Sequence, residues 1–366
     1  MKKQDMVNDG FKPKKKNLKK VMELGKNKFT EKTLDAMRTC GSYLEFIATF
    51  DKEKKKLVHG DFCKNRFCPI CAWRKARKDA LMLSIMMKAI TEEKGYEYIF
   101  LTLTTPNVKA DQLKDEIDLF NKALSKMFRR QRVQNAINGY VRKLEVTYNK
   151  ARDDYNPHFH LILAVDKHYF TNPRKYIKQS EWLDIWRDVT GKTGINPDGT
   201  DEITQLDIRK VKGLQQENAV QEVAKYSAKD FELTSSQEVF DAFYEALKGR
   251  QLITFNGVFK EYRKKYEDGE LDKYKKIDEN EYYWFLTATW IKKEMKYEQE
   301  YREMNEDEKK FFSKKYIEEK DCVMLYFLNL KLDINVLLKI VFFSLITLFS
   351  FIKFILNLHK AQKEIL

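Results

Sequence analysis

The chain has 366 residues, which is long enough to bury a full hydrophobic core and to form more than one domain. Its 69 lysines and arginines outnumber its 55 aspartates and glutamates. The resulting net charge of +14 favours a protein that binds an anionic partner over a basic protein without one. Nucleic acid is the first candidate for this partner, and an anionic membrane surface is the second. The five cysteines and the lack of an N-terminal signal peptide argue against a disulfide-linked secreted protein and favour a metal-binding protein of the cytoplasm.

The N-terminal segment is rich in lysine and poor in apolar side chains, most clearly between residues 12 and 20. This composition predicts a basic flexible arm over residues 1–36. Such an arm is either a solvated tail or a contact for the DNA backbone.

A cysteine-rich segment follows at residues 37–92, where the pattern predicts strands at 44–50 and 57–62 and a helix over about 70–91. Four cysteines of this segment supply enough thiolates for a closed tetrahedral Zn²⁺ site, namely Cys40, Cys63, Cys68 and Cys71. His59 is a substitute ligand if Cys40 is out of reach, and buried reduced thiols are the alternative to a metal site. Basic side chains beside the cluster are candidates for DNA binding, namely Arg66, Arg74, Lys75, Arg77 and Lys78.

Residues 93–260 are expected to form the largest domain, in which strands and helices mix. The predicted strands are 96–104, 139–148, 157–165 and 203–211. The predicted helices are 110–136, 180–189 and 215–230. Because the strands follow one another in hairpin-like or loosely spaced order, the pattern favours an α+β fold with a central antiparallel sheet over a doubly wound parallel sheet.

Two of the chain's five histidines, His158 and His160, lie one residue apart in a predicted strand and therefore share one face. If the strands 139–148 and 157–165 pair about the centre of their loop, Glu145 lies roughly opposite His158. Two imidazoles and a carboxylate would complete a three-ligand site with open positions, suited to Mg²⁺ or Mn²⁺. The alternative is a pair of histidines that bind no metal.

The helix predicted at 215–230 carries Glu222 and Tyr226 four residues apart, with Lys229 on the same side. A tyrosine hydroxyl becomes a useful nucleophile only when a nearby cation or metal lowers its pKa. A surface helix whose tyrosine packs at the edge of the core is the alternative.

The C-terminal part of the chain is expected to contain a charged helical region at 261–325 and a hydrophobic helix within 326–366. Residues 334–358 are apolar over a length that suits a bilayer. A spanning helix, an interfacial helix, a helix packed on the protein and an atypical C-terminus all remain open. The expected location is therefore cytoplasmic, with membrane association through residues 334–358 left open.

Three segments together resemble the HUH endonuclease superfamily, and within it the rolling-circle replication initiators of small bacterial plasmids. They are residues 100–107, 158–160 and 222–229, in the order that the family has them. The resemblance covers about residues 37–290 and includes the cysteine-rich lead-in. It implies the HUH endonuclease fold for the domain at 93–260.

The resemblance also implies roles for the site residues. The two histidines would bind the metal, Tyr226 would nick one DNA strand to leave a 5′-phosphotyrosine and a free 3′-hydroxyl primer, and Glu222 would activate water for a later cleavage or strand transfer. Lys229 would position the tyrosine oxygen. The implied partners are plasmid origin DNA, both duplex and single-stranded, and the host helicase and DNA polymerase, with a homodimer left open.

Three alternatives of function remain at this point. The first is a relaxase or transposase of the same superfamily. The second is a metal-dependent phosphodiesterase without a covalent step. The third is a non-catalytic, zinc-containing DNA-binding regulator.

Overall fold

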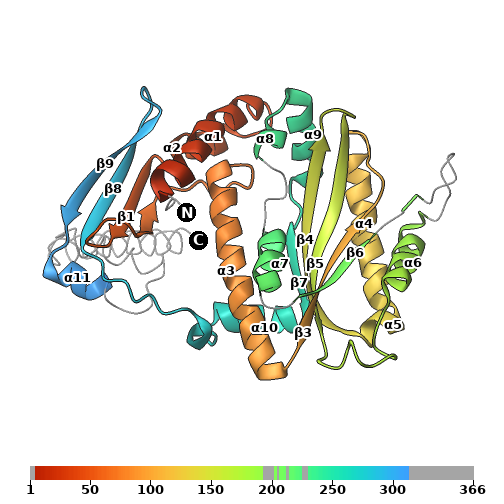
Figure 1. Cartoon of the computed structure of the whole chain (residues 1–366). Helices are drawn as coiled ribbons and strands as arrows, with labels where there is room; N and C mark the ends of the chain where they lie inside the picture. Colours follow the sequence, from red (N-terminus) through yellow and green to blue (C-terminus); the bar gives the residue numbers. More distant parts are fainter. Residues whose placement is uncertain (1–4, 193–201, 204–205, 212–213, 225–229, 313–366) are drawn as a thin grey trace, which may run out of the picture. The chain divides into compact units, whose positions relative to one another are not determined.

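The computed structural model describes residues 5–192, 202–203, 206–211, 214–224 and 230–312 (Figure 1). The chain divides into two compact units. One consists of the described residues within 1–43, 61–277 and 288–298, and the other of those within 44–60, 278–287 and from 299 onward. The division predicted from the sequence, with boundaries at 36, 92, 260 and 325, stays a prediction.

A five-stranded sheet forms the centre of the first unit, with the strand order β6-β3-β5-β4-β7. Its strands are β3 (Glu97–Thr104), β4 (Ile137–Asn149), β5 (Asp154–Val165), β6 (Asp207–Val211) and β7 (Ile253–Gly257). Every neighbouring pair in this sheet is antiparallel. The predicted α+β class with an antiparallel sheet is therefore confirmed, while its assignment to the HUH fold stays a prediction.

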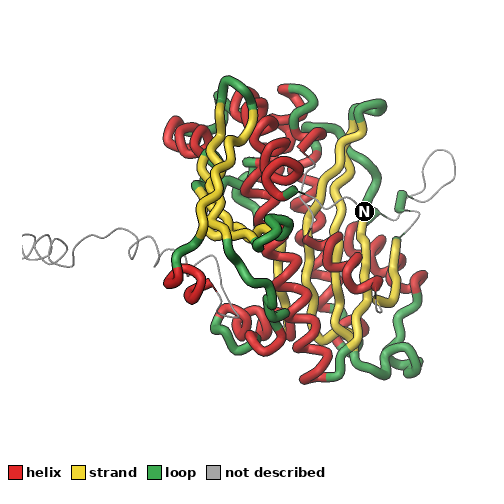
Figure 2. Tube along the Cα trace, turned by 60° about the vertical axis from the view of Figure 1, so that its left-hand side comes forward, coloured by secondary structure: helices red, strands yellow, loops and turns green. Residues whose placement is uncertain are grey.

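Helices cover both faces of this sheet (Figures 1 and 2). On one face, α3 (Pro69–Lys94), α7 (Leu214–Ala224) and α10 (Val258–Glu267) share an apolar core with the strands. On the other face, Phe120 of α4 (Leu113–Arg129) packs edge-on against Phe159 of β5 and against Trp186 of α6 (Gln179–Thr190). Alternate residues of β5 thus point to opposite faces that are both buried.

Further helices of this unit are α5 (Gln131–Gln134), α8 (Asp230–Leu233), α9 (Gln237–Leu247) and η2 (Asp272–Tyr274). The turn from β7 into α10 requires glycine. Gly257 has a φ of +55°, and a Cβ there would lie 2.3 Å from the carbonyl oxygen of Asn138.

The N-terminal segment is helical, so the prediction of a flexible arm over residues 1–36 was wrong for its described part. It contains η1 (Met6–Phe11), α1 (Lys12–Leu24) and α2 (Glu31–Thr39). Leu18 and Val21 are almost fully buried, and α1 packs against α3. These few apolar residues lie on one helical face, so the lysines between them fill the exposed face and hide the periodicity.

The second sheet has the strand order β2-β1-β8-β9. Its strands are β1 (Tyr43–Ala48), β2 (Lys55–Gly60), β8 (Trp284–Ile291) and β9 (Lys296–Glu303), and α11 (Glu306–Phe312) follows. The prediction of a charged helical region at 261–325 was therefore wrong for β8 and β9. The charges mislead only in β9, where the exposed Lys296, Glu298 and Glu300 alternate with the more buried Tyr297, Gln299 and Tyr301, whereas β8 carries no charged residue.

None of the helices in the described part of the chain has the length and apolar content needed to cross a membrane. The segment 334–358, for which membrane contact was considered, lies outside the described residues.

Candidate metal centres

The first candidate centre lies on the hairpin formed by β4 and β5. In the register of this hairpin Glu145 pairs with His158, and Lys143 pairs with His160. The predicted position of Glu145 across from His158 is therefore confirmed. Because directly paired residues in a sheet point to the same face, both histidines and Glu145 point to the face that α3, α7 and α10 cover.

The three side chains meet at their tips. Glu145 Oε2 lies 3.2 Å from His160 Nε2 and 3.5 Å from His158 Nε2. The carboxylate and both rings are largely buried, with 6%, 11% and 12% of the side chains exposed for Glu145, His160 and His158. One oxygen and two nitrogens thus converge at a single point on a largely enclosed surface.

The other ring nitrogen of each histidine has a partner that fixes the ring. His158 Nδ1 lies 3.1 Å from the carbonyl oxygen of Asn156, to which it donates a hydrogen bond, and this tautomer leaves Nε2 with a free lone pair. His160 Nδ1 lies 3.2 Å from Thr102 Oγ1 of β3. Partners of this kind orient metal-binding histidines, so both Nε2 atoms are available as ligands.

The charges around the centre are arranged to keep Glu145 ionised. Burial alone would raise the pKa of Glu145, but the nearby rings of His158 and His160 outweigh burial and hold the pKa well below its ordinary range. Burial lowers the pKa of the neighbouring Lys143 to about 8. An ionised carboxylate and two imidazoles are a donor set that fits Mg²⁺ or Mn²⁺, with the imidazoles favouring the latter.

The segment 100–107 supports this centre from β3. Thr104 pairs in register with His158. Its hydroxyl also contacts the Asn156 side chain, whose amide donates a 2.7 Å hydrogen bond to Asn107. The carbonyl that accepts from His158 therefore belongs to a residue that this network holds in place. Sequence reasoning missed Thr102 and Asn156, because a hydroxyl or amide in a strand carries no spacing signal of its own.

The second candidate centre is the cysteine cluster, in which the described structure brings all four predicted thiols together. Cys40 Sγ lies 3.5 Å from the sulfurs of Cys68 and of Cys71, and Cys63 Sγ lies 3.6 Å from that of Cys71. A zinc ion with bonds of about 2.3 Å to four sulfurs requires sulfur pairs about 3.8 Å apart. The thiols therefore fit a tetrahedral site, and the substitute ligand His59 is not needed.

Backbone and side-chain groups hold this cluster. The amides of Cys63 and Lys64 donate to the sulfurs of Cys40 and Cys71, at 3.5 and 3.2 Å. Lys15 of α1 is buried, and its Nζ donates to the carbonyl of Cys40 at 2.6 Å and to Ser42 Oγ at 2.9 Å. Hydrogen bonds with neighbouring thiols, that of Cys40 first, lower the pKa of Cys63 and raise that of Cys68, so the four thiols share their protons unequally.

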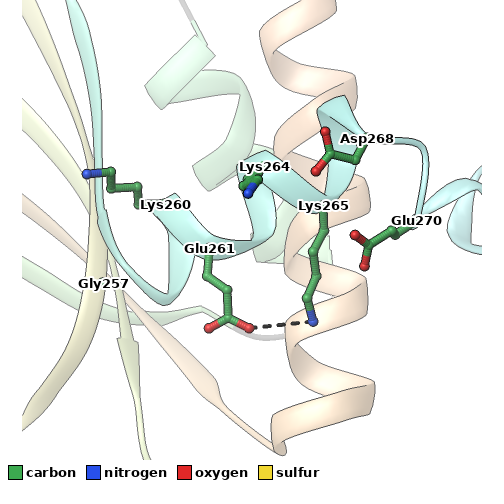
Figure 3. Close-up of a pocket in the computed structure, with 7 residues that line it drawn as sticks. All are labelled: Gly257, Lys260, Glu261, Lys264, Lys265, Asp268 and Glu270. Atoms are coloured by element: carbon green, nitrogen blue, oxygen red, sulfur yellow. Dashed lines mark ion pairs between the residues drawn. The ribbon is translucent and has the colours of Figure 1, made fainter.

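The described part of the first unit also has a pocket along α10 that belongs to neither centre (Figure 3). Its lining is Gly257, Lys260, Glu261, Lys264, Lys265, Asp268 and Glu270. Cations and carboxylates balance each other there, and Glu261 and Lys265 form an ion pair at 3.5 Å. A pocket lined by paired surface charges carries no donor set comparable to the two centres.

Comparison with known proteins identifies the family. The family model described as "Replication protein" matches residues 54–307. The chain belongs to the replication protein family. A "Protein rep" of Staphylococcus aureus is 52% identical over 200 residues, which are 55% of this chain and 83% of the relative. A "Protein rep" of a Bacillus species is 34% identical over 271 residues, which are 67% of this chain and 86% of the relative.

The family predicted from the three segments, the Rep replication initiators of plasmids, is thereby confirmed. No solved structure matches this member of the family. The roles of individual residues stay predictions.

The third predicted segment is described only in part. In this replication protein Glu222 is half-buried on α7, which packs against β4 and β5. The next residue, Val223, is fully buried in the same core as Phe100 and Ile162. Tyr226 and Lys229 lie outside the described residues, so their predicted position beside Glu222 stays a prediction.

The five basic residues proposed for DNA binding lie in different surroundings. Arg66 donates to the carbonyls of Leu247 and Arg250, at 2.9 and 2.6 Å, and therefore joins two segments of the protein. Arg74 stacks on Phe62, at 3.3 Å from the ring centre, and burial lowers its pKa. The other three are exposed on α3, namely Lys75, Arg77 and Lys78. Their contact with DNA stays a prediction.

Proposed function

We propose that this replication protein initiates rolling-circle replication of a plasmid by nicking one strand of the origin and becoming covalently attached to it. The observation that carries the proposal is the convergence of Glu145, His158 and His160 at one point. A cluster of this composition with open coordination positions suits phosphodiester chemistry. Membership in the replication protein family supports DNA replication as the process that this chemistry serves.

Glu145, His158 and His160 would hold a Mg²⁺ or Mn²⁺ ion, and such an ion supplies Lewis-acid stabilisation of the charge that develops on a scissile phosphate. The Asn156 carbonyl and the Thr102 hydroxyl keep both Nε2 atoms directed at the ligand position. The low pKa of Glu145 keeps a negative ligand in place at neutral pH.

Tyr226 is the proposed nucleophile, by its match to the family's third motif. Its oxygen would attack phosphorus and lose its proton, and the bond to the 3′-oxygen would break. The 5′-phosphate then remains on the tyrosine, and the 3′-oxygen takes up a proton and serves as primer. Lys229 would stabilise the tyrosine oxygen before attack.

Termination would use Glu222. After one round of synthesis Glu222 would act as general base for a water molecule that cleaves the regenerated origin, or the strand would be transferred. The half-buried position of Glu222 on a helix that packs against β4 and β5 supports this assignment.

The cysteine cluster is proposed to hold a structural Zn²⁺, because its four sulfurs have tetrahedral spacing and leave no ligand position open. The basic helix α3 that begins at this cluster would contact the duplex origin, with salt-sensitive affinity. Cytoplasmic location, host helicase and polymerase as partners, and a homodimer belong to the same proposal. Membrane contact through residues 334–358 is not required by it.

The deciding experiment is a nicking assay on single-stranded origin DNA with Mn²⁺. The wild type should yield a covalent protein–DNA adduct, and Tyr226→Phe should abolish it while DNA binding remains. An adduct that survives in Tyr226→Phe would remove the tyrosine from its role. Cleavage that survives without any adduct would favour a phosphodiesterase, and binding without cleavage by the wild type would favour a regulator.

A further inference from the structure

An arginine on the edge strand β6 lies beside the face that carries the Glu145–His158–His160 centre. Arg209 pairs in register with Phe100 of β3. The Phe100 ring stacks on His160, with ring centres 5.4 Å apart and an interplanar angle of 29°. The guanidinium carbon of Arg209 lies 4.5 Å from the centre of the Phe100 ring. Cation, aromatic ring and candidate metal ligand therefore form a row across three strands.

This row limits how far the guanidinium is from the centre. The guanidinium carbon of Arg209 lies 4.5 Å from the Phe100 ring centre, which lies 5.4 Å from the His160 ring centre. The guanidinium carbon is therefore at most about 10 Å from the His160 ring centre. The Phe100 ring lies between them and is buried, so it acts as a fixed spacer. A strand of DNA whose scissile phosphate lay at the histidines would thus pass within reach of this arginine.

The guanidinium is weakly neutralised. Half of the Arg209 side chain is exposed, and its ion pair with Asp207 is 3.9 Å long and exposed on both sides. Ion pairs of this kind contribute little, because water screens them. Stacking on Phe100 holds the planar group in one orientation, which reduces the entropy lost when an oxyanion binds.

The neighbouring Lys210 differs from Arg209 in the face of the sheet to which it points and in its ion pair. Lys210 pairs in register with Ile99, so its side chain points to the opposite face of the sheet. There Lys210 forms an ion pair with Glu97, and its Nζ lies 3.9 Å from the centre of the Phe170 ring. The strand β6 thus has one cation in a close ion pair on the far face and one half-exposed, weakly paired cation on the face of the centre.

We propose that Arg209 binds a backbone phosphate of single-stranded DNA, next to the phosphate that lies at Glu145, His158 and His160. The inference rests on the proposed function, because it names a second contact for the same substrate. A guanidinium can bind two phosphate oxygens at once, and such charge-assisted bonds are about twice as strong as neutral ones. No bond is made or broken in this step.

The test measures binding of a fluorescein-labelled oligo-dT by anisotropy, in EDTA-free buffer without added divalent metal, over a range of salt concentrations. Arg209→Ala should weaken binding roughly three- to tenfold at 0.1 M salt, as expected for one lost phosphate contact. It should also reduce the slope of log K against log salt by about 0.7, the value for one neutralised phosphate of a single strand. Arg209→Lys should restore the slope but only part of the affinity.

Lys210→Ala is the matched control, because it removes one charge from the same strand on the opposite face. It should leave the affinity and the slope unchanged. If a thermal melt shows that Arg209→Ala is destabilised, Arg209→Gln replaces it in the binding measurement. Equal effects of Arg209→Ala and Lys210→Ala, or an unchanged slope in both Arg209→Ala and Arg209→Gln, would overturn the inference. If the wild type neither binds nor nicks single-stranded DNA, the proposed function itself fails.

Discussion

The two candidate metal centres differ in what their ligands leave free. The cysteine cluster supplies four sulfurs, which would complete a tetrahedron around the proposed zinc. The centre at Glu145, His158 and His160 supplies three donors and therefore leaves coordination positions for water or substrate. A closed set of ligands stabilises a fold, whereas an open set can do chemistry, so the proposed function assigns the two tasks to different centres.

A buried lysine near each centre shows the same difference. Lys15 is 8% exposed and donates to three oxygens around Cys40, so its charge is fully used within the fold. Lys143 is 7% exposed beside His160, where burial lowers its pKa and the carboxylates of Asp79 and Glu145 act on its charge through space. The lysine beside the cysteine cluster is held by direct hydrogen bonds, whereas the lysine beside the other centre is surrounded by charges that act on it through space.

Removal of the zinc ligands should have the largest effect on stability. Cys68 is fully buried, and Cys68→Ser should lose zinc and lower the melting temperature by more than about 10 °C, because the binding energy of a structural zinc is folding energy. Zinc per chain is measured by mass spectrometry and unfolding by circular dichroism. Cys322→Ser is the matched control, since this cysteine is not a proposed ligand. A zinc content that stays at one in Cys68→Ser would contradict the assignment.

Loss of a ligand at the Glu145–His158–His160 centre should reduce activity strongly and stability little. His158→Ala should reduce nicking by at least about 10²-fold, because one ligand of the proposed catalytic ion is removed. The zinc content should remain that of the wild type and the melting temperature should fall less than in Cys68→Ser, since His158 lies outside the cysteine cluster. His168→Ala, which removes an exposed histidine, should leave nicking unchanged. Unfolding of His158→Ala would show that this centre is structural.

Lys15 tests whether the cysteine cluster depends on groups that are not ligands. Lys15→Met keeps the length of the side chain but leaves three buried or half-buried acceptors without their donor, at a cost of about 1–3 kcal/mol. We expect a lower melting temperature and faster loss of zinc to a chelator, with nicking intact at low temperature. Lys19→Met changes an exposed lysine of the same helix and is the control. Identical chelation rates for both variants would argue against the role of Lys15.

The contrast between Lys15 and Glu145 also shows which contacts can be predicted from the sequence. Glu145 could be predicted, because the register of a hairpin follows from the length of its loop and from the alternation of its strands. Lys15 could not, since it lies in a run of lysines and differs from them only in pointing inward. Contacts close in the sequence obey local geometry, whereas the contact between Lys15 and Cys40 depends on how α1 packs.

The same reasoning explains the elements that were predicted wrongly. The helix α1 has only two fully apolar core positions, Leu18 and Val21, and β9 carries charges on its exposed face. In both, tertiary packing decides a structure that composition argues against. Cys40 lies between these cases. The sequence suggests Cys40 as a fourth ligand of the cluster, with His59 as the substitute. Only the position of α2, which ends directly before Cys40, shows that the Cys40 thiol reaches the cluster.

Thr102 tests the smallest contribution to the open centre. Thr102→Val has nearly the same shape but lacks the hydroxyl that lies 3.2 Å from His160 Nδ1. The ring would then lose one of the contacts that direct Nε2, and the affinity for Mn²⁺ should fall about tenfold while the melting temperature changes little. Mn²⁺ binding is followed by electron paramagnetic resonance, with Thr102→Ser as the variant that keeps the hydroxyl. If both variants bind Mn²⁺ equally well, packing against Phe100 alone orients His160, and the hydroxyl is dispensable.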